Sequence, residues 1–224
     1  MSKKTALKMT ALAAAFAATA VPMTAAAEIS GNLAVSNMYL WRGLNISGGA
    51  AVSGGLDYSH ESGFYAGVWT SSEFLRSEYD LFAGYAFEAG GVSVDISYWD
   101  YNYPENMGSD VEEVVVGIGV ADFSLGAYIG VGEVGHGNGA TDNENNYFTV
   151  GYSYDKFGVT VGTWDNEVDE TNYTHLDLSY ALTDNFTFIA SKVVAADDFA
   201  LGAAGDSDDA ADDLQFAVSY SFDL

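Results

Sequence analysis

The chain has 224 residues, no cysteine, and 32 acidic against 7 basic residues, which gives a formal net charge of −25. This charge excludes nucleic acid and anionic lipid surfaces as partners, and the lack of cysteine excludes disulfides and thiolate metal sites. The length suffices for one domain with a core of its own.

The N-terminal segment has the features of a secretory signal. Three lysines precede an alanine-rich apolar run, and the small residues 25–27 fit a cleavage site. We therefore expect residues 1–27 to be removed and the mature chain, residues 28–224, to begin at Glu28. A membrane anchor is the alternative, but the run is too short and too rich in alanine. Without the signal, four basic and 32 acidic residues remain, a formal charge of −28.

Alternating apolar and polar residues, separated by glycine, asparagine and aspartate, indicate strands along the whole mature chain. The pattern predicts an all-β domain of about twelve antiparallel strands. The predicted strands span residues 29–41, 51–60, 64–74, 78–88, 92–103, 111–121, 123–132, 146–154, 157–165, 173–182, 186–195 and 214–224.

The connections between these strands alternate in length. Tight turns are expected at residues 61–63, 89–91, 122, 155–156 and 183–185, whereas the other connections are mostly longer and more polar. Short turns at one end and long loops at the other are typical of an up-and-down outer-membrane β-barrel with both termini on the periplasmic side. A soluble ligand-binding barrel is the alternative, and it gives no reason for this alternation.

The closing segment, residues 214–224, places apolar side chains at every second position. This pattern predicts a lipid-facing last strand, and it resembles the recognition signal of the bacterial barrel-assembly machinery. Aromatic residues near the strand ends further predict interfacial girdles, with ordinary core aromatics as the alternative. The predicted girdle residues are Tyr39, Trp41, Tyr98, Trp99, Tyr101, Tyr103 and Trp164.

Four motifs stand in the first half of the chain. They are YLWRG at residues 39–43, GGLDYSHESGFYAGVW at 54–69, EYDL with GY at 78–85, and YNYP at 101–104. Over roughly residues 30–105 the chain resembles the TorF-type porins, proteobacterial outer-membrane proteins of unknown function. The residues of the first motif that carry the resemblance are Tyr39, Trp41, Arg42 and Gly43. The resemblance implies an outer-membrane location and a passive channel, and it supplies no catalytic residues.

Five carboxylates fall on the predicted inward faces of the strands. They are Asp57, Asp80, Asp95, Glu113 and Asp177. In a narrow water-filled lumen with few basic residues, such carboxylates favour cations. The sequence therefore predicts pore-lining residues and a cation preference. The alternative is that hydrogen bonds pair these groups inside a closed barrel.

The sequence thus predicts an outer-membrane channel of a Gram-negative bacterium for passive diffusion of small hydrophilic solutes or ions. Neither a cofactor nor an enzymatic activity is expected, because the histidines are scattered and no nucleophile stands with a base. The aspartate-rich segment 197–213 could bind divalent cations through oxygen ligands, or it could be a solvated loop. The alternative function is a closed structural or surface barrel whose acidic loops bind cations or partners.

Overall fold

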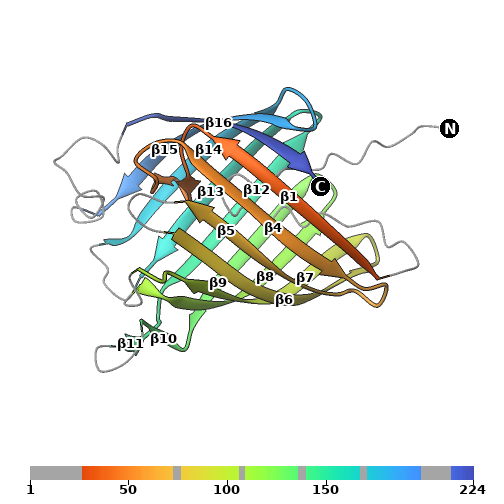
Figure 1. The fold of residues 1–224 in the computed structure, drawn as a ribbon. Helices are drawn as coiled ribbons and strands as arrows, with labels where there is room; N and C mark the ends of the chain where they lie inside the picture. Colours follow the sequence, from red (N-terminus) through yellow and green to blue (C-terminus); the bar gives the residue numbers. More distant parts are fainter. Residues whose placement is uncertain (1–26, 73–76, 106–108, 136–139, 167–170, 198–212) are drawn as a thin grey trace.

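The computed structural model describes residues 27–72, 77–105, 109–135, 140–166, 171–197 and 213–224. Twelve antiparallel strands form one closed barrel in which β1 pairs with β16 (Figure 1). The barrel strands are β1 (Glu28–Ser36), β4 (Ala51–Ser59), β5 (Phe64–Ser72), β6 (Ser77–Ala89), β7 (Val92–Asn102), β8 (Val111–Val120), β9 (Phe123–Val131), β12 (Asn146–Tyr154), β13 (Phe157–Asp165), β14 (Tyr173–Ala181), β15 (Phe186–Ala196) and β16 (Gln215–Asp223). The predicted twelve-stranded antiparallel barrel is confirmed.

The alternation of the sequence decides which side chains face out. Large apolar residues project from the outer surface of every barrel strand, and examples are Leu81, Val150 and Phe216, which are 47%, 53% and 59% exposed. Between them, the inward faces carry glycine, serine, threonine and acidic residues, together with a cluster of tyrosine and tryptophan rings. Because side chains alternate along a strand, the outer face is almost continuously apolar, and polar and acidic side chains point into the lumen together with the aromatic cluster.

Among the described residues, no helix has the length and apolar character needed to cross a membrane.

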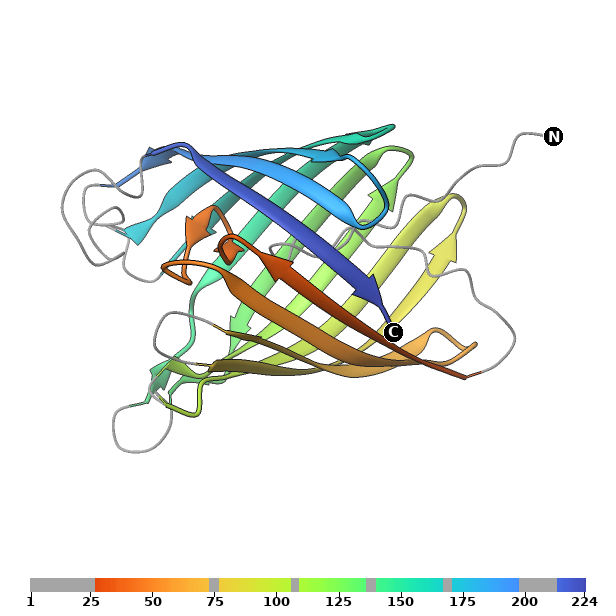
Figure 2. The ribbon, with the colours of Figure 1, turned by 45° about the horizontal axis from the view of Figure 1, so that its top comes forward.

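The two ends of the barrel differ. At one end, called the turn end here, the strands are joined by tight turns, for example by Gly90 and Gly91, whose φ angles are 63° and 84°. The first strand begins at this end, where Glu28 pairs with Ser59, and the last strand finishes there. At the opposite end, called the loop end, longer segments connect the strands (Figure 2).

Two of the loop-end connections contain small hairpins of their own. The pair β2 (Leu40–Trp41) and β3 (Leu44–Asn45) lies between β1 and β4, and it forms a separate two-stranded sheet. A second pair, β10 (Glu133–Val134) and β11 (Thr141–Asp142), lies between β9 and β12. The first hairpin turns into the barrel (Figures 1 and 2), where Leu40 and Arg42 are almost completely buried.

The predicted strand over residues 29–41 was therefore too long. Strand β1 ends at Ser36, and the next residue, Asn37, bonds to β16 with its side chain as well as with its backbone amide, which donates to the carbonyl of Val218 at 3.2 Å. Its Nδ2 donates to the carbonyl of Phe216 at 2.8 Å, and its Oδ1 accepts from the amide of Val218 at 2.6 Å. With the edge of β16 occupied, the chain leaves the barrel wall and folds inward.

The predicted aromatic girdles were wrong for most of their residues. Tyr39, Trp99, Tyr101 and Tyr103 are buried inside the barrel, and Trp41 and Trp164 pack against each other there. Of the predicted set, Tyr98 projects outward. The outer aromatic residues that contact one another gather instead near the turn end. They include Phe64, Tyr85, Phe87, Phe123, Tyr152, Phe157, Tyr180, Phe186, Tyr220 and Phe222.

Candidate functional site

The inward-folded hairpin, residues 39–45, is called the plug hairpin here. Its tip is a two-residue turn in which Arg42 and Gly43 have φ angles of 47° and 87°. Positive φ at both central residues is the requirement of the type I′ turn, which matches the twist of a tight hairpin. Gly43 is also needed for space, because a Cβ there would lie 2.5 Å from Cγ of His175 on β14. The hairpin tip therefore lies directly against His175 on the barrel wall.

The tip carries a buried ion pair to the barrel wall. Arg42 is 2% exposed, and its two terminal nitrogens donate to the two carboxylate oxygens of Glu113 on β8 at 2.8 and 2.6 Å. Tyr101 on β7 donates a further hydrogen bond to Glu113 at 3.0 Å. Burial alone lowers the pKa of Arg42, but the Glu113 carboxylate outweighs this effect and raises the pKa above its ordinary value. The guanidinium is therefore charged and held in two-point contact.

Four aromatic rings surround the same guanidinium. The Cζ atom of Arg42 lies 4.5–4.7 Å from the ring centroids of Trp41, Tyr128, Tyr147 and Trp164. Each of these distances is within the range of a cation–π interaction. We call the four rings together with Glu113 the Arg42 cage. It combines a carboxylate with aromatic faces, which is a combination that binds weakly hydrated organic cations.

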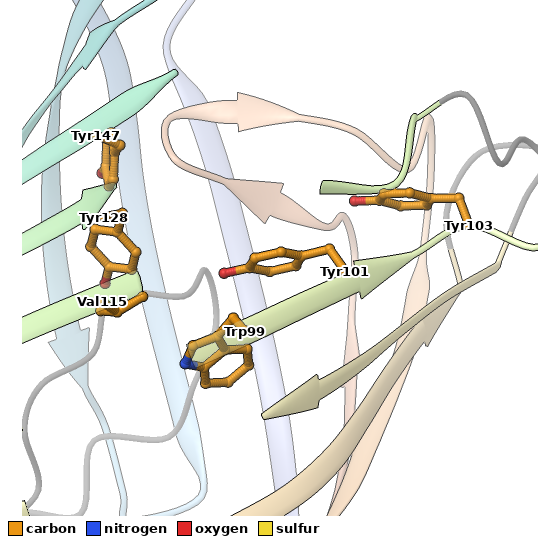
Figure 3. Packing of buried hydrophobic residues seen from close by; sticks show 6 residues of the cluster. All are labelled: Trp99, Tyr101, Tyr103, Val115, Tyr128 and Tyr147. Carbon is orange, nitrogen blue, oxygen red and sulfur yellow. The ribbon is translucent and has the colours of Figure 1, made fainter. Parts of the chain in front are cut away.

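The wall part of the cage follows from the strand register. Tyr147 on β12 pairs directly with Tyr128 on β9 and with Trp164 on β13, and the ring centroids are 5.3 and 5.4 Å apart. The three rings thus form a row across three neighbouring strands. Figure 3 shows Tyr128 and Tyr147 from this row, with Trp99 and Tyr101 of β7, all pointing into the barrel.

A hydrogen-bonded chain continues from the cage along the wall. The hydroxyl of Tyr147 lies 2.7 Å from Nε2 of His175, and Nδ1 of His175 lies 3.0 Å from a carboxylate oxygen of Asp177. Because Asp177 accepts, Nδ1 donates to it, and in the neutral ring Nε2 accepts from Tyr147. The ring of His175 also stacks on Tyr147 with an interplanar angle of 4°. This chain fixes the wall against which Gly43 rests.

Side chains rather than backbone pairing dock the plug hairpin. Leu40 packs against Ile189 and Ala217, and Leu44 packs against Tyr173 and Val193, all on the adjacent strands β14, β15 and β16. The hydroxyl of Tyr173 donates to the carbonyl of Arg42 at 2.9 Å. The hairpin is thus a separate element held in the lumen by an ion pair, apolar contacts and a hydrogen bond.

At its root, the plug hairpin is held by Tyr39. This residue is buried beside two carboxylates, Glu78 and Asp80, and Glu78 accepts a hydrogen bond from Tyr103 at 2.7 Å. Burial raises the pKa of Tyr39 well above its ordinary value, and the two carboxylates add to this effect. Tyr39 therefore stays neutral, which suits a hydroxyl that has to lie among carboxylates.

The turn half of the lumen, defined by the inward-facing residues nearest the turn end, has a different lining. Small residues such as Gly117, Gly151 and Ser179 face inward there. The hydroxyl of Tyr65 donates to the carboxylate of Asp95 at 2.8 Å, and Asn32 contacts Asp57 at 3.4 Å. Asn32, Asp57, Tyr65 and Ser179 are half-buried, whereas Gly117, Gly151 and Asp95 are buried.

The five carboxylates predicted to line a pore all lie on inward faces of the barrel, but in two groups. Glu113 and Asp177 belong to the cage and its hydrogen-bonded chain, and Asp80 lies beside Tyr39. Asp57 and Asp95 lie in the turn half. That these residues line a conducting path stays a prediction.

The motif residues Tyr39, Trp41, Arg42 and Gly43 were singled out by resemblance, and the structure places all four in the plug hairpin. Sequence reasoning missed the wall residues of the cage, Tyr128 and Tyr147, and took Trp164 for a girdle residue. The parity of each strand could have found them. Each shares its face with inward glycines or threonines, as Trp164 does with Gly162, Thr160 and Gly158.

The sequence model of a bacterial family described as a bacterial protein of unknown function, Gcw_chp, matches residues 19–184. The chain belongs to this family. The Gcw_chp match includes the plug hairpin, Glu113 and the three wall rings of the cage. A search of the curated proteins gives no match.

Several solved structures resemble this member of the Gcw_chp family. The KdgM porin superimposes with a TM-score of 0.53 at 7% identity, over 87% of this chain and 98% of that one. The KdgM porin in complex with disordered oligogalacturonate gives 0.50 at 7% identity, over 88% and 98%. Outer membrane phospholipase A from Escherichia coli gives 0.44 at 12% identity, over 86% and 88%. At these identities the KdgM likeness shows a shared barrel fold and no more.

Proposed function

We propose that the protein is an outer-membrane channel for passive diffusion of small hydrophilic solutes or ions, of the TorF type, with a preference for cations. The observation that carries the proposal is the division of the barrel into an apolar outer face and a polar lumen. A water-soluble protein rarely exposes so large an apolar surface. The role requires no cofactor and no catalytic residue.

The outer surface supports a membrane location. Its apolar band runs round the whole barrel, and contacting aromatic residues gather near the turn end, as in the girdles of membrane barrels. In such barrels the short turns and both termini lie on the periplasmic side, which we propose for this chain. Insertion would then proceed through the barrel-assembly machinery after removal of the signal, residues 1–27. Residues 1–26 of this signal lie outside the described residues.

Charge supports the cation preference. Of the three basic residues that the structure describes, Lys156 and Lys192 are exposed, and the charge of Arg42 is neutralised by Glu113. Asp57 and Asp95 therefore dominate the field in the turn half. A low-dielectric wall focuses that field, which raises the local concentration of cations. The same charge argues against an acidic sugar polymer such as the oligogalacturonate bound by the KdgM porin.

The plug hairpin sets the constriction in this proposal. It occupies the loop half, so solutes would pass beside it or after it moves. This same observation favours the second candidate, a closed structural barrel in which the hairpin seals the lumen. The aspartate-rich segment could add cation binding in either case, but its residues 198–212 lie outside the described residues.

Conductance in planar bilayers separates the two candidates. Wild type is compared with a variant in which residues 40–45 are replaced by glycine and serine, which keeps the length and removes the docking side chains. A channel predicts measurable cation-selective conductance for wild type and larger conductance for the variant. If neither protein conducts, the channel proposal is wrong and the structural barrel is the better assignment.

Cell fractionation tests the location. The mature protein should be recovered in the outer membrane with Glu28 as its first residue. Recovery in the soluble periplasm, or an uncleaved N-terminus in the inner membrane, would contradict the proposal.

A further inference from the structure

We propose that the Arg42 cage is a binding site for small guanidinium-type cations and that Arg42 is its built-in ligand. An external cation of this chemistry would compete with Arg42 for Glu113 and the aromatic rings, and thereby release the plug hairpin. Binding to the cage stands on the geometry of the site alone. Its consequence for conduction rests on the proposed channel function.

The first step is that the wall of the cage belongs to the barrel and does not depend on the hairpin. Glu113, Tyr128, Tyr147 and Trp164 lie on β8, β9, β12 and β13, which are consecutive neighbours in the barrel. Their positions are set by the strand register. Of the cage rings, Trp41 alone comes from the hairpin. When the hairpin leaves, three rings and a carboxylate therefore remain as a preformed site.

The second step is that an empty cage would attract a cation strongly. Glu113 is 4% exposed with the hairpin in place, and removal of the Arg42 side chain alone would leave its charge beside aromatic rings and the hydroxyl of Tyr101 without an ion-pair partner. A buried carboxylate that has lost its partner is highly unfavourable. A positively charged ligand bound next to Glu113 would neutralise this charge.

The third step is that the chemistry of the cage favours a guanidinium over a metal ion. The two oxygens of Glu113 accept from two nitrogens of one planar group, which is the fork geometry of a guanidinium. Aromatic faces prefer large, weakly hydrated cations, whereas sodium keeps its water. Among the described residues, no group of three or more potential metal ligands occurs.

The fourth step is that Arg42 is a displaceable ligand. Its Nε atom is buried without a hydrogen-bond partner, so the resident side chain leaves part of its hydrogen-bonding capacity unused. Its turn carries positive φ at a non-glycine residue, which is an uncommon backbone conformation. A free guanidinium bears neither restriction, since it can orient all its nitrogens without bending a chain.

Binding is tested on the variant Arg42→Ala in detergent, with methylguanidinium as the probe at low millimolar concentration. Isothermal titration calorimetry should detect binding to Arg42→Ala, and affinity should fall by about tenfold or more in Arg42→Ala/Glu113→Gln, which lacks the carboxylate. Equal affinity for the two variants would overturn the proposal. So would equal binding of sodium or tetramethylammonium, because neither offers the planar fork.

Wild type supplies a second measurement if Arg42→Ala does not fold. Trypsin cleaves after arginine, and Arg42 is protected while the hairpin is docked. Methylguanidinium should accelerate cleavage after Arg42, while cleavage after Lys156, in an exposed turn, stays constant as the internal control. An unchanged ratio of the two cleavage rates would contradict the proposal. Neither assay uses conduction, so a failure of the channel function leaves both results interpretable.

Discussion

The loop half and the turn half of the lumen are built on the same strands and differ in what fills them. In the loop half, aromatic rings and the Arg42–Glu113 ion pair close round the plug hairpin. In the turn half, glycine and serine line the wall together with Asp57, which is half-buried, and Asp95, which is buried and accepts from Tyr65. The difference follows from the connections, because a long loop can fold back into the barrel and a tight turn cannot. The same strands therefore serve both halves, and the connections at each end decide whether the lumen is filled.

The largest expected difference between the halves concerns their carboxylates. Glu113→Gln leaves the buried charge of Arg42 without its partner, which should weaken hairpin docking by about 3–5 kcal/mol. Trypsin cleavage after Arg42 in the folded protein should accelerate about a hundredfold or more. Asp95→Asn in the turn half is the matched control and should leave Arg42 protected. Equal cleavage of both variants would mean that the ion pair does not hold the hairpin.

The second comparison is the loss of stability when a glycine in each half is replaced by alanine. Gly43→Ala forces a side chain into positive φ and against His175, so we expect a loss of about 1–3 kcal/mol. At Gly117, a Cβ would meet its nearest neighbour, Asp95, at 3.6 Å, and Gly117→Ala should change stability by less than about 1 kcal/mol. Thermal unfolding in detergent measures both. A larger loss for Gly117→Ala would reverse our assignment of the crowded half.

Tyrosine hydroxyls give a third contrast, of about the same size as the second. Tyr147→Phe leaves the buried Nε2 of His175 without its partner and should cost about 1–3 kcal/mol. Tyr65 is half-buried, so water can replace its hydroxyl at Asp95, and Tyr65→Phe should cost less than about 1 kcal/mol. The denaturation midpoints of the two variants provide the comparison. The contrast fails if both substitutions are equally costly.

The smallest expected effect is on ion selectivity. In the double variant Asp57→Asn/Asp95→Asn, the cation-to-anion permeability ratio should fall by roughly two- to threefold, equivalent to about 0.4–0.7 kcal/mol. Asp177→Asn should change the ratio less, because Asp177 is paired with His175. Reversal potentials under a salt gradient measure the ratio, and the effect should weaken as salt rises. A dominant effect of Asp177→Asn would place the selective region in the loop half.

The barrel could be predicted because each of its determinants is local in the chain. Alternation sets the face of every strand, and glycine, asparagine and aspartate mark the turns, as at Gly90 and Asp155. The inward position of Asp57, Asp80, Asp95, Glu113 and Asp177 followed from the same alternation. With an even number of strands, the first strand begins and the last strand finishes at the same end of the barrel. The two can therefore pair as antiparallel neighbours and close it.

The plug hairpin could not be predicted in this way. The apolar parity of strand β1 continues through Tyr39 and Trp41, so the local pattern reads as one long strand. The strand ends just before Asn37, whose side chain bonds to Phe216 on β16. These two residues are 179 positions apart in the chain. What holds Arg42 is Glu113, 71 residues along the chain. Periodicity determines which way a side chain points relative to its own strand. Only the closed barrel brings together the distant groups that turn this segment from wall into plug.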